Sequence, residues 1–117
     1  MKIDVLVYLA GPITPKNGFT IEENVSVGVK TFLSLIDIGI PAYSPQMVAA
    51  FPSAFHIDWE KWMSFDKLII TRCTHMLMLP NWRDSKGACE ERKFAEKLQI
   101  RVCESIPELL NAINEVV

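Results

Sequence analysis

The sequence predicts an α/β fold in which helices cover both faces of a parallel sheet, as in a three-layer sandwich. Two observations support this fold class. Short apolar segments alternate with amphipathic segments of helical period along the 117 residues, a pattern typical of parallel sheets with helical crossovers. The first apolar segment, residues 3–10, is almost uninterrupted, as expected for a strand buried on both faces. We expect a single domain over residues 1–117.

The first half of the chain predicts a strand, a helix and a second strand. Residues 3–10 form the first strand, which a Gly-Pro pair closes. Thr20 and Glu23 have the spacing of a capping box, which starts a helix that ends near Gly39. Residues 40–43 form a short second strand, so a right-handed crossover between parallel strands is expected. The apolar stripe expected on the helix consists of Val25, Val29, Phe32, Leu33 and Ile36.

The middle of the chain is less regular. Residues 46–57 are interrupted by Pro52 and are expected to form a mobile flap. Asp58 is a suitable N-cap residue for a helix that runs to about residue 72. The residues expected on the inner side of this helix are Trp59, Trp62, Met63, Asp66, Ile69 and Ile70.

Two further strand and helix pairs complete the predicted fold. Residues 75–79 form the third strand and residues 100–103 the fourth, with a helix between them that starts near Ser85. Ser105 and Pro107 mark the start of the last helix. The simplest right-handed winding gives a sheet of four, or at most five, parallel strands in the order 2-1-3-4.

The composition excludes several classes of protein. The net charge is -2 and the basic residues are scattered, so a nucleic-acid polymer is not an expected partner. Three cysteines without short spacings indicate neither a disulfide framework nor a zinc site. We expect them to be reduced and mostly buried, with no metal and no cofactor, and His56 and His75 to be structural. The N-terminal apolar run is too short for a signal peptide or a membrane span, so a cytoplasmic location without a membrane partner is expected.

The topology predicts where a ligand binds. In open parallel sheets, ligands occupy the crevice beyond the carboxyl ends of the strands, where the winding reverses. Here this crevice lies between the first and third strands. Gly11, Pro12 and Ile13 follow the first strand and residues 80–87 follow the third, so the two loops should face each other.

Glu91 is the most informative residue of this region. A helix that starts near Ser85 places Ala88, Glu91, Ala95 and Leu98 on one packed stripe. A carboxylate on such a stripe indicates either an acid at the base of a cleft or a rim residue paired with Lys86 or Lys97. The sequence pattern leaves both positions open.

Asp66 and Tyr8 are candidates for the same site. Asp66 comes from a different helix, and two carboxylates at a sugar carbon break glycosidic bonds when one attacks the carbon and the other protonates the leaving group. A surface position paired with Lys67 or Arg72 is the other interpretation of Asp66. Tyr8 either packs in the core or hydrogen-bonds the acid and tunes it.

The loop before Glu91 carries candidate binding residues. Ser85, Gly87 and the free N–H groups of the helix start can bind an anion such as a 5′-phosphate, although a cap serine and a turn glycine also have ordinary structural roles. Trp82 is expected to stack on a base or a partner chain, while Trp59 and Trp62 are expected in the core. No P-loop, dinucleotide-binding or serine-hydrolase motif is present in the sequence.

Several segments together carry a resemblance. They are Tyr8-Leu9-Ala10-Gly11-Pro12-Ile13, Tyr43-Ser44-Pro45, Asp66 seven residues before Cys73, Leu79-Pro80 with Trp82, Asp84-Ser85-Lys86-Gly87-Ala88, Glu91 and Ala95. This set resembles the nucleoside 2-deoxyribosyltransferase-like superfamily, in particular its small bacterial and phage branch. The resemblance covers about residues 5–102. Its most specific parts are the opening Tyr-Leu-Ala-Gly-Pro and the Ser-x-Gly-Ala-x-x-Glu segment.

The resemblance implies a flavodoxin-like fold, a homodimer or larger homo-oligomer, and cleavage of the N-glycosidic bond of a deoxynucleoside or its 5′-monophosphate. It maps the glutamate nucleophile onto Glu91, an assisting aspartate onto Asp66 and a nearby tyrosine onto Tyr8. Ser85 matches a phosphate-binding serine. The substrate-binding residues expected from the sequence as a whole are Gly11, Pro12, Ile13, Trp82, Ser85 and Gly87.

The chain also departs from this pattern. Thr74 stands where the small branch often has an aspartate, and Asn81 where it often has a glycine. The C-terminal segment that closes the site in true transferases is expected to have no counterpart, which favours a hydrolase or a binding protein with vestigial chemistry.

We therefore expect an N-glycosidase that acts on a deoxynucleotide or deoxynucleoside through Glu91. The other function class is a nucleotide-binding or sensing module with weak or no catalysis. A substrate of the nicotinamide or ADP-ribose type is a third interpretation, since attack at C1′ is similar chemistry.

Overall fold

The predicted sheet order is confirmed by the computed structural model, which describes residues 1–15 and 18–114. Within these residues, four strands form one parallel sheet in the order β2-β1-β3-β4. The strands are β1 (Val7–Ala10), β2 (Ala42–Tyr43), β3 (His75–Met78) and β4 (Arg101–Cys103). β1 and β3 are adjacent although a long stretch of chain separates them, so the winding reverses between them, as predicted.

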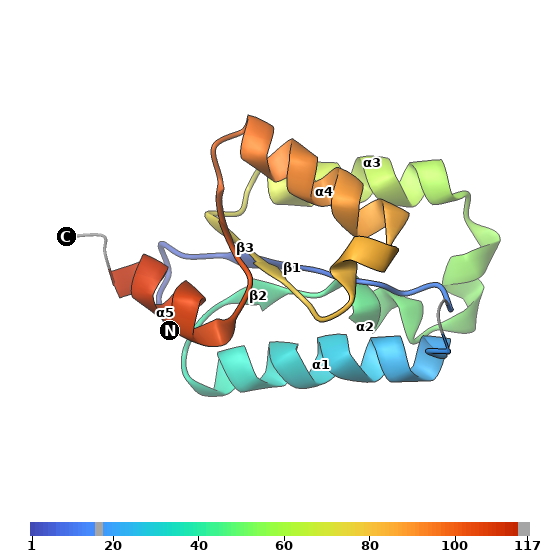
Figure 1. Ribbon diagram of the computed structural model, residues 1–117, viewed down its shortest axis with the longest axis horizontal. Helices are drawn as coiled ribbons and strands as arrows, with labels where there is room; N and C mark the ends of the chain where they lie inside the picture. Colours follow the sequence, from blue (N-terminus) through green and yellow to red (C-terminus); the bar gives the residue numbers. More distant parts are fainter. Residues whose placement is uncertain (16–17, 115–117) are drawn as a thin grey trace.

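Helices cover both faces of the sheet, as Figure 1 shows, with α3 and α4 on one side and α1 and α5 on the other. The longer helices are α1 (Ile21–Asp37), α3 (Trp59–Ile70), α4 (Lys86–Lys97) and α5 (Ile106–Asn114). The short helical segments are α2 (Pro45–Ala49), η1 (Pro52–His56) and η2 (Trp82–Asp84), of which η1 and η2 are 3₁₀ helices. The three-layer arrangement is therefore the one expected from the sequence.

The buried central strand β1 divides the core into two clusters. Val7 and Leu9 point into the cluster under α1 and α5, which contains Leu35 and Leu109. Tyr8 and Ala10 point into the cluster under α3 and α4. Because successive residues of a strand face opposite sides, Tyr8 is directed toward the helix that carries Glu91.

The predicted first strand is longer than the observed one. Ile3 is 95 % exposed, and β1 begins only at Val7, where its partners β2 and β3 also begin. An apolar run continues as a strand only where neighbouring strands satisfy its backbone groups. Lys2 instead donates its backbone N–H to the carbonyl of Gly39.

The capping box that starts α1 is confirmed, but the predicted apolar stripe is partly wrong. Thr20 and Glu23 exchange both capping hydrogen bonds. Leu33 is 57 % exposed, whereas the buried positions of the helix include Gly28. Gly28 is buried because Gln46 of α2 lies against it, and a Cβ atom at this glycine would fall 2.4 Å from the Cβ of Gln46.

The segment predicted as a mobile flap contains regular structure. Residues 46–57 include most of α2 and all of η1. Trp62 of α3 donates its indole N–H to the carbonyl of Ala54 at 2.8 Å. The α2–η1 segment thus packs against the first turns of α3 and lies at the carboxyl end of the sheet. Asp58 precedes α3, as predicted, but its side chain forms no cap hydrogen bond.

None of the helices in the described part of the chain combines the length and the apolar character needed to cross a membrane.

Candidate active site

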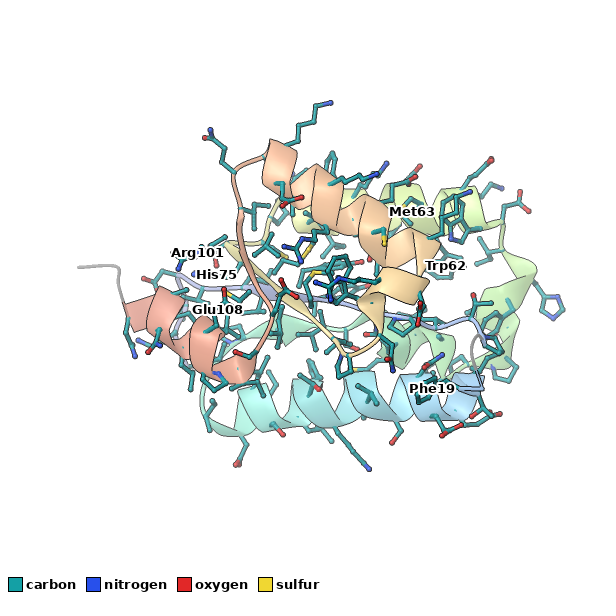
Figure 2. The ribbon with its side chains drawn as sticks, in the orientation of Figure 1. Phe19, Trp62, Met63, His75, Arg101 and Glu108 are labelled. Atoms are coloured by element: carbon teal, nitrogen blue, oxygen red, sulfur yellow. The ribbon has the colours of Figure 1, made fainter. Side chains whose placement is uncertain are left out.

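A cavity of about 510 Å³ lies beyond the carboxyl ends of the strands. Its volume is in the range of small-molecule sites. In Figure 2, His75 and Arg101 lie toward the end of the sheet where β3 and β4 begin, and Trp62 and Met63 lie toward the other end. The walls come from the loop after β1, the α2–η1 segment, the inner side of α3 and the start of α4.

Glu91 lies at the base of this cavity and is only 5 % exposed. It stands on the buried face of α4 between Ala88 and Ala95, whose small side chains allow α4 to pack closely on the sheet. The hydroxyl of Tyr8 donates to Glu91 Oε2 at 2.5 Å. The position at the base of a cleft is therefore the correct interpretation, and pairing with Lys86 or Lys97 is wrong.

Asp66 reaches the same cluster from α3 and is 9 % exposed. Its carboxyl group lies close enough to Glu91 and Tyr8 to raise the pKa of both. The suggested surface pairing with Lys67 is wrong, because Lys67 pairs with Glu90 at 3.4 Å. Three elements, β1, α3 and α4, thus bring Tyr8, Asp66 and Glu91 together.

The prediction that Ala88, Glu91, Ala95 and Leu98 share one packed face of α4 is correct for the first three residues only. Leu98 is 43 % exposed, whereas Ala88, Glu91 and Ala95 are buried. Leu98 is the C-cap residue, and the turn that follows it leads away into β4.

Burial controls the ionisation of the two acids. Desolvation raises the pKa of Glu91, the neighbouring Asp66 raises it further, and the hydrogen bond from Tyr8 lowers it in part. Desolvation also raises the pKa of Asp66, while hydrogen bonds with Glu91 and Tyr8 lower it. The shift is larger for Glu91. Two acids so close together hold a proton at pH values where exposed carboxyl groups are fully ionised.

Two phenols flank the acids. Burial, followed by the charge of Glu91, raises the pKa of Tyr8 well above its usual value. Burial, followed by the charge of Asp66, raises the pKa of Tyr43 to about 12. Both tyrosines are therefore neutral hydrogen-bond donors over the physiological pH range.

The start of α4 forms another wall. Ser85 is the N-cap residue, and its Oγ accepts the backbone N–H of Ala88 at 3.1 Å. Ser85, Lys86 and Gly87 line the cavity, and the first turn of α4 contains no acidic residue. The partial positive charge of the helix start is thus not neutralised from within the helix. The ammonium group of Lys86 lies 5.0 Å from the centre of the Trp59 ring.

The remaining predicted binding residues have different positions. Gly11 and Ile13 line the cavity. Pro12 instead lines a separate hollow of about 110 Å³ beside α1. Trp82 is not among the residues that line the main cavity. Its ring packs on the core cluster under α3 and α4, with the guanidinium carbons of Arg83 and Arg92 at 4.5 and 4.6 Å from its centre.

Other residues of the cavity were assigned differently or missed by the sequence analysis. Trp59 and Trp62 were expected in the core, yet both line the cavity, and Trp59 is 46 % exposed. Tyr43 lines it as well, and the Tyr-Ser-Pro segment that starts at the last residue of β2 was the available signal. The fully buried Gln46 holds the loop after β1 by donating its side-chain amide to the carbonyl of Gly11 at 3.3 Å.

The described residues contain no group of three or more His, Cys, Asp and Glu side chains that could hold a metal ion. All three cysteines are free thiols, and Cys73 and Cys103 are buried.

The fold and the site define a parallel α/β domain with a buried pair of acids at the switch point of its sheet. Residues 5–104 match the profile of a family described as Domain of unknown function (DUF4406), and the chain belongs to this family. No curated protein matches the sequence.

Proposed function

We propose that the protein is an N-glycosidase that cleaves the bond between base and sugar of a deoxynucleoside or deoxynucleoside 5′-monophosphate. The observation that carries this proposal is the cluster of Tyr8, Asp66 and Glu91, which is buried at the base of a cavity of nucleoside size. Most enzymes that cleave glycosidic bonds use two carboxyl groups with different pKa values, one as the acid and the other as the nucleophile or base.

In the first step, a carboxylate oxygen of Glu91 attacks C1′ while the C1′–N bond breaks. The electron pair of that bond goes to the base nitrogen, which takes the proton held by Asp66. The Tyr8 hydroxyl donates to the other oxygen of Glu91 and so favours its ionised form. The step leaves a glycosyl ester on Glu91, a free base and an ionised Asp66.

In the second step, water attacks C1′ of the ester. Asp66, now ionised, accepts a proton from the water, and the C1′–O bond to Glu91 breaks with its electron pair returning to the carboxylate. The products are the free sugar, or its 5′-phosphate, and the enzyme in its starting protonation state. Because Asp66 gives one proton to the base and regains one from water, the cluster requires no further acid or base.

Attack on C1′ requires the shared proton on Asp66 and a charged Glu91, whereas the free site prefers the proton on Glu91. Burial raises the pKa of Glu91 more than that of Asp66, so the shared proton favours Glu91. Positive charge that develops at C1′ lies next to Glu91 and favours its ionised form. The proton is therefore favoured on Asp66, where the leaving base needs it, as the C1′–N bond begins to break.

The rest of the cavity supports a nucleoside-like ligand. Trp59, Trp62 and Phe55 give part of the wall an aromatic character, which suits a base. Ser85, Lys86 and the start of α4 provide a place for a 5′-phosphate. The resemblance of these segments to the nucleoside 2-deoxyribosyltransferase-like superfamily supports the same assignment, including a homodimer or larger homo-oligomer as the working assembly.

A binding or sensing module without useful turnover is the second candidate. One observation favours it: burial keeps Glu91 protonated in the free site, and a protonated carboxyl group is a poor nucleophile. Under this candidate, a nucleotide binds tightly but no base is released, and Glu91→Gln changes affinity only.

Chromatographic detection of free base decides between the two. The purified protein is incubated with a panel of deoxynucleosides and their 5′-monophosphates, alongside Glu91→Ala and Glu91→Gln. We expect base release by the parent protein and a loss of at least a thousandfold in both variants. Glu90→Ala is the matched control, because Glu90 is the neighbouring acid and pairs with Lys67 instead of joining the cluster. Equal turnover by the parent protein and Glu91→Gln would falsify the proposal.

A further inference from the structure

Tyr43 is a second phenol beside the acid cluster. It ends β2, and in the parallel pairing of β1 and β2 it lies opposite Tyr8. Paired residues of neighbouring strands point to the same face of a sheet, so both rings lie on the side of α3 and α4. Their centres are 5.8 Å apart and their planes are inclined by 33°. The position of the Tyr43 ring is thus fixed by its strand and by its neighbour.

The two hydroxyl groups have different partners. Tyr8 donates to Glu91, whereas the hydroxyl of Tyr43 has no hydrogen-bond partner among residues 1–15 and 18–114. Tyr43 lines the cavity and is partly buried. The hydroxyl oxygen is not fully buried, so a molecule that occupies the cavity can provide its hydrogen-bond partner.

The surroundings of Tyr43 restrict the chemistry of this partner. Burial and the charges of Asp66 and Glu91 keep Tyr43 protonated, because they raise its pKa to about 12. The same carboxyl groups repel an anionic acceptor. A neutral hydroxyl group fits the position well, since it can accept from the phenol and donate to a carboxylate at the same time.

We propose that the Tyr43 hydroxyl binds a sugar hydroxyl of the substrate and determines which sugars the site accepts. This inference rests on the proposed function for the identity of the ligand. Tyr43 contacts the substrate itself, whereas Tyr8 acts on the substrate through Glu91. The two tyrosines are therefore expected to change different kinetic quantities when their hydroxyl groups are removed.

A comparison of sugars tests the contact. Adenosine, 2′-deoxyadenosine, 2′,3′-dideoxyadenosine and the matching thymine nucleosides are titrated by calorimetry into Glu91→Gln, in which turnover is blocked. The same series is titrated into Glu91→Gln with Tyr43→Phe. With Tyr43 present, loss of the contacted hydroxyl weakens binding about five- to tenfold. With Tyr43→Phe, the same loss has little effect, because the partner hydroxyl is gone.

Turnover gives a second measurement. Tyr43→Phe in the parent protein raises KM for substrates that carry the contacted hydroxyl, with little change in kcat or in the pH profile. Tyr8→Phe is the matched control, since it also removes one phenolic hydroxyl but retains the dependence on the sugar and shifts the pH profile. The thermal midpoint of Tyr43→Phe separates this effect from misfolding, because the ring and its packing are kept.

The outcomes separate the two proposals. An equal dependence on sugar hydroxyls with and without Tyr43→Phe overturns the Tyr43 contact, even if the parent protein releases base. The expected dependence without base release supports the contact and overturns the glycosidase activity alone. Absence of both binding and base release over the whole series overturns both.

Discussion

Glu91 is deeply buried, yet in the proposed mechanism it must carry a charge to act as a nucleophile. Tyr8 and Asp66 offset this conflict. The Tyr8 hydroxyl donates a short hydrogen bond to the Glu91 carboxyl group, and in the proposed mechanism Asp66 holds the proton that Glu91 gives up. The three side chains therefore act as one titrating unit, and a change in any one of them alters the others.

Tyr8→Phe removes the donor that favours ionised Glu91. The pKa of Glu91, already raised by burial, rises further, so a larger fraction of the enzyme is inactive at neutral pH. We expect the acidic limb of kcat/KM to move to higher pH and the rate near pH 6 to fall by about tenfold, as for loss of one hydrogen bond to a charged group. A pH profile of base release measures the shift. An unchanged acidic limb would show that Tyr8 does not tune Glu91.

The acid pair also predicts how stability depends on pH. Glu91 and Asp66 have pKa values that are higher in the folded protein than in the unfolded chain. Their contribution is fully present below about pH 4, and it is lost as the pH rises through the folded pKa values. The parent protein should therefore be more stable at pH 5 than at pH 9.

Glu91→Gln should remove the larger part of the stability loss that the parent protein undergoes as the pH rises from 5 to 9. At pH 9 the variant should exceed the parent protein by about 1–3 kcal/mol in the free energy of unfolding, while at pH 5 the two should be similar. Urea denaturation at pH 5, 7 and 9 measures the difference. Glu90→Gln is the control, and it should follow the parent protein at each pH. A parent protein of constant stability over this range would contradict the raised pKa values.

At the scale of the elements, the start of α4 has a structural role, and we propose that it also binds the ligand. Ser85 caps the helix and lines the cavity, whereas Thr20 caps α1 away from the cavity. The two caps therefore form a natural comparison for separating helix stability from ligand binding.

Ser85→Ala and Thr20→Ala should each lower the free energy of unfolding by about 1 kcal/mol, because each removes a side-chain acceptor from an N-terminal N–H group. Only Ser85→Ala should also raise KM for deoxynucleoside 5′-monophosphates. Urea denaturation and base-release kinetics on the same two variants check both statements. Equal KM values for both variants would assign Ser85 a purely structural role.

At the scale of the whole molecule, the charge of the cavity is unbalanced. Its described lining residues include three acids, Asp66, Asp84 and Glu91, and one cation, Lys86. A 5′-phosphate therefore depends on Lys86 and on the start of α4 for its favourable electrostatic interactions. A nucleoside without a phosphate does not.

Lys86→Met should raise KM for 5′-monophosphates by about fivefold at low salt, an effect expected for one partly exposed charge. The effect should decrease in high salt, and KM for the corresponding nucleosides should not change. Lys67→Met is the control, since Lys67 pairs with Glu90 and is not a lining residue of the cavity. An equal change for nucleosides and monophosphates would exclude a phosphate contact.

The sequence was sufficient for those features that depend on local periodicity. The strand order follows from the alternation of apolar runs and helical stripes and is confirmed. The helical stripe placed Glu91 on the packed side of α4 but left a half-exposed rim position open, and only the structure decides for the buried position. Leu33 was placed wrongly because the packed face of α1 passes through Asn24, Gly28 and Leu35, and Leu33 lies off that face. An apolar residue count could not set this phase, since two of the three buried positions are an asparagine and a glycine. Leu98 was placed wrongly because it is the C-cap residue, where α4 ends.

The outer part of the cavity could not be predicted for a related reason. Trp59 and Trp62 have the spacing and the apolar character of core residues. They line a cavity because the α2–η1 segment, which binds Trp62 through Ala54, forms another wall of the same cavity. That arrangement depends on how the segments pack in three dimensions, and no short-range pattern in the chain reports it.

The close packing of Gly28 against Gln46 links two distant positions of the chain. Gln46 fills the space that a side chain at position 28 would need, and its amide holds the carbonyl of Gly11 at the edge of the cavity. Because the nearest atom is the Cβ of Gln46, a larger residue at position 28 requires either a glycine at position 46, which would release the Gly11 loop, or a shift of α2 away from α1. Across family members, we expect these two positions to vary together, so that members without a glycine at the first also differ in which ligands they select.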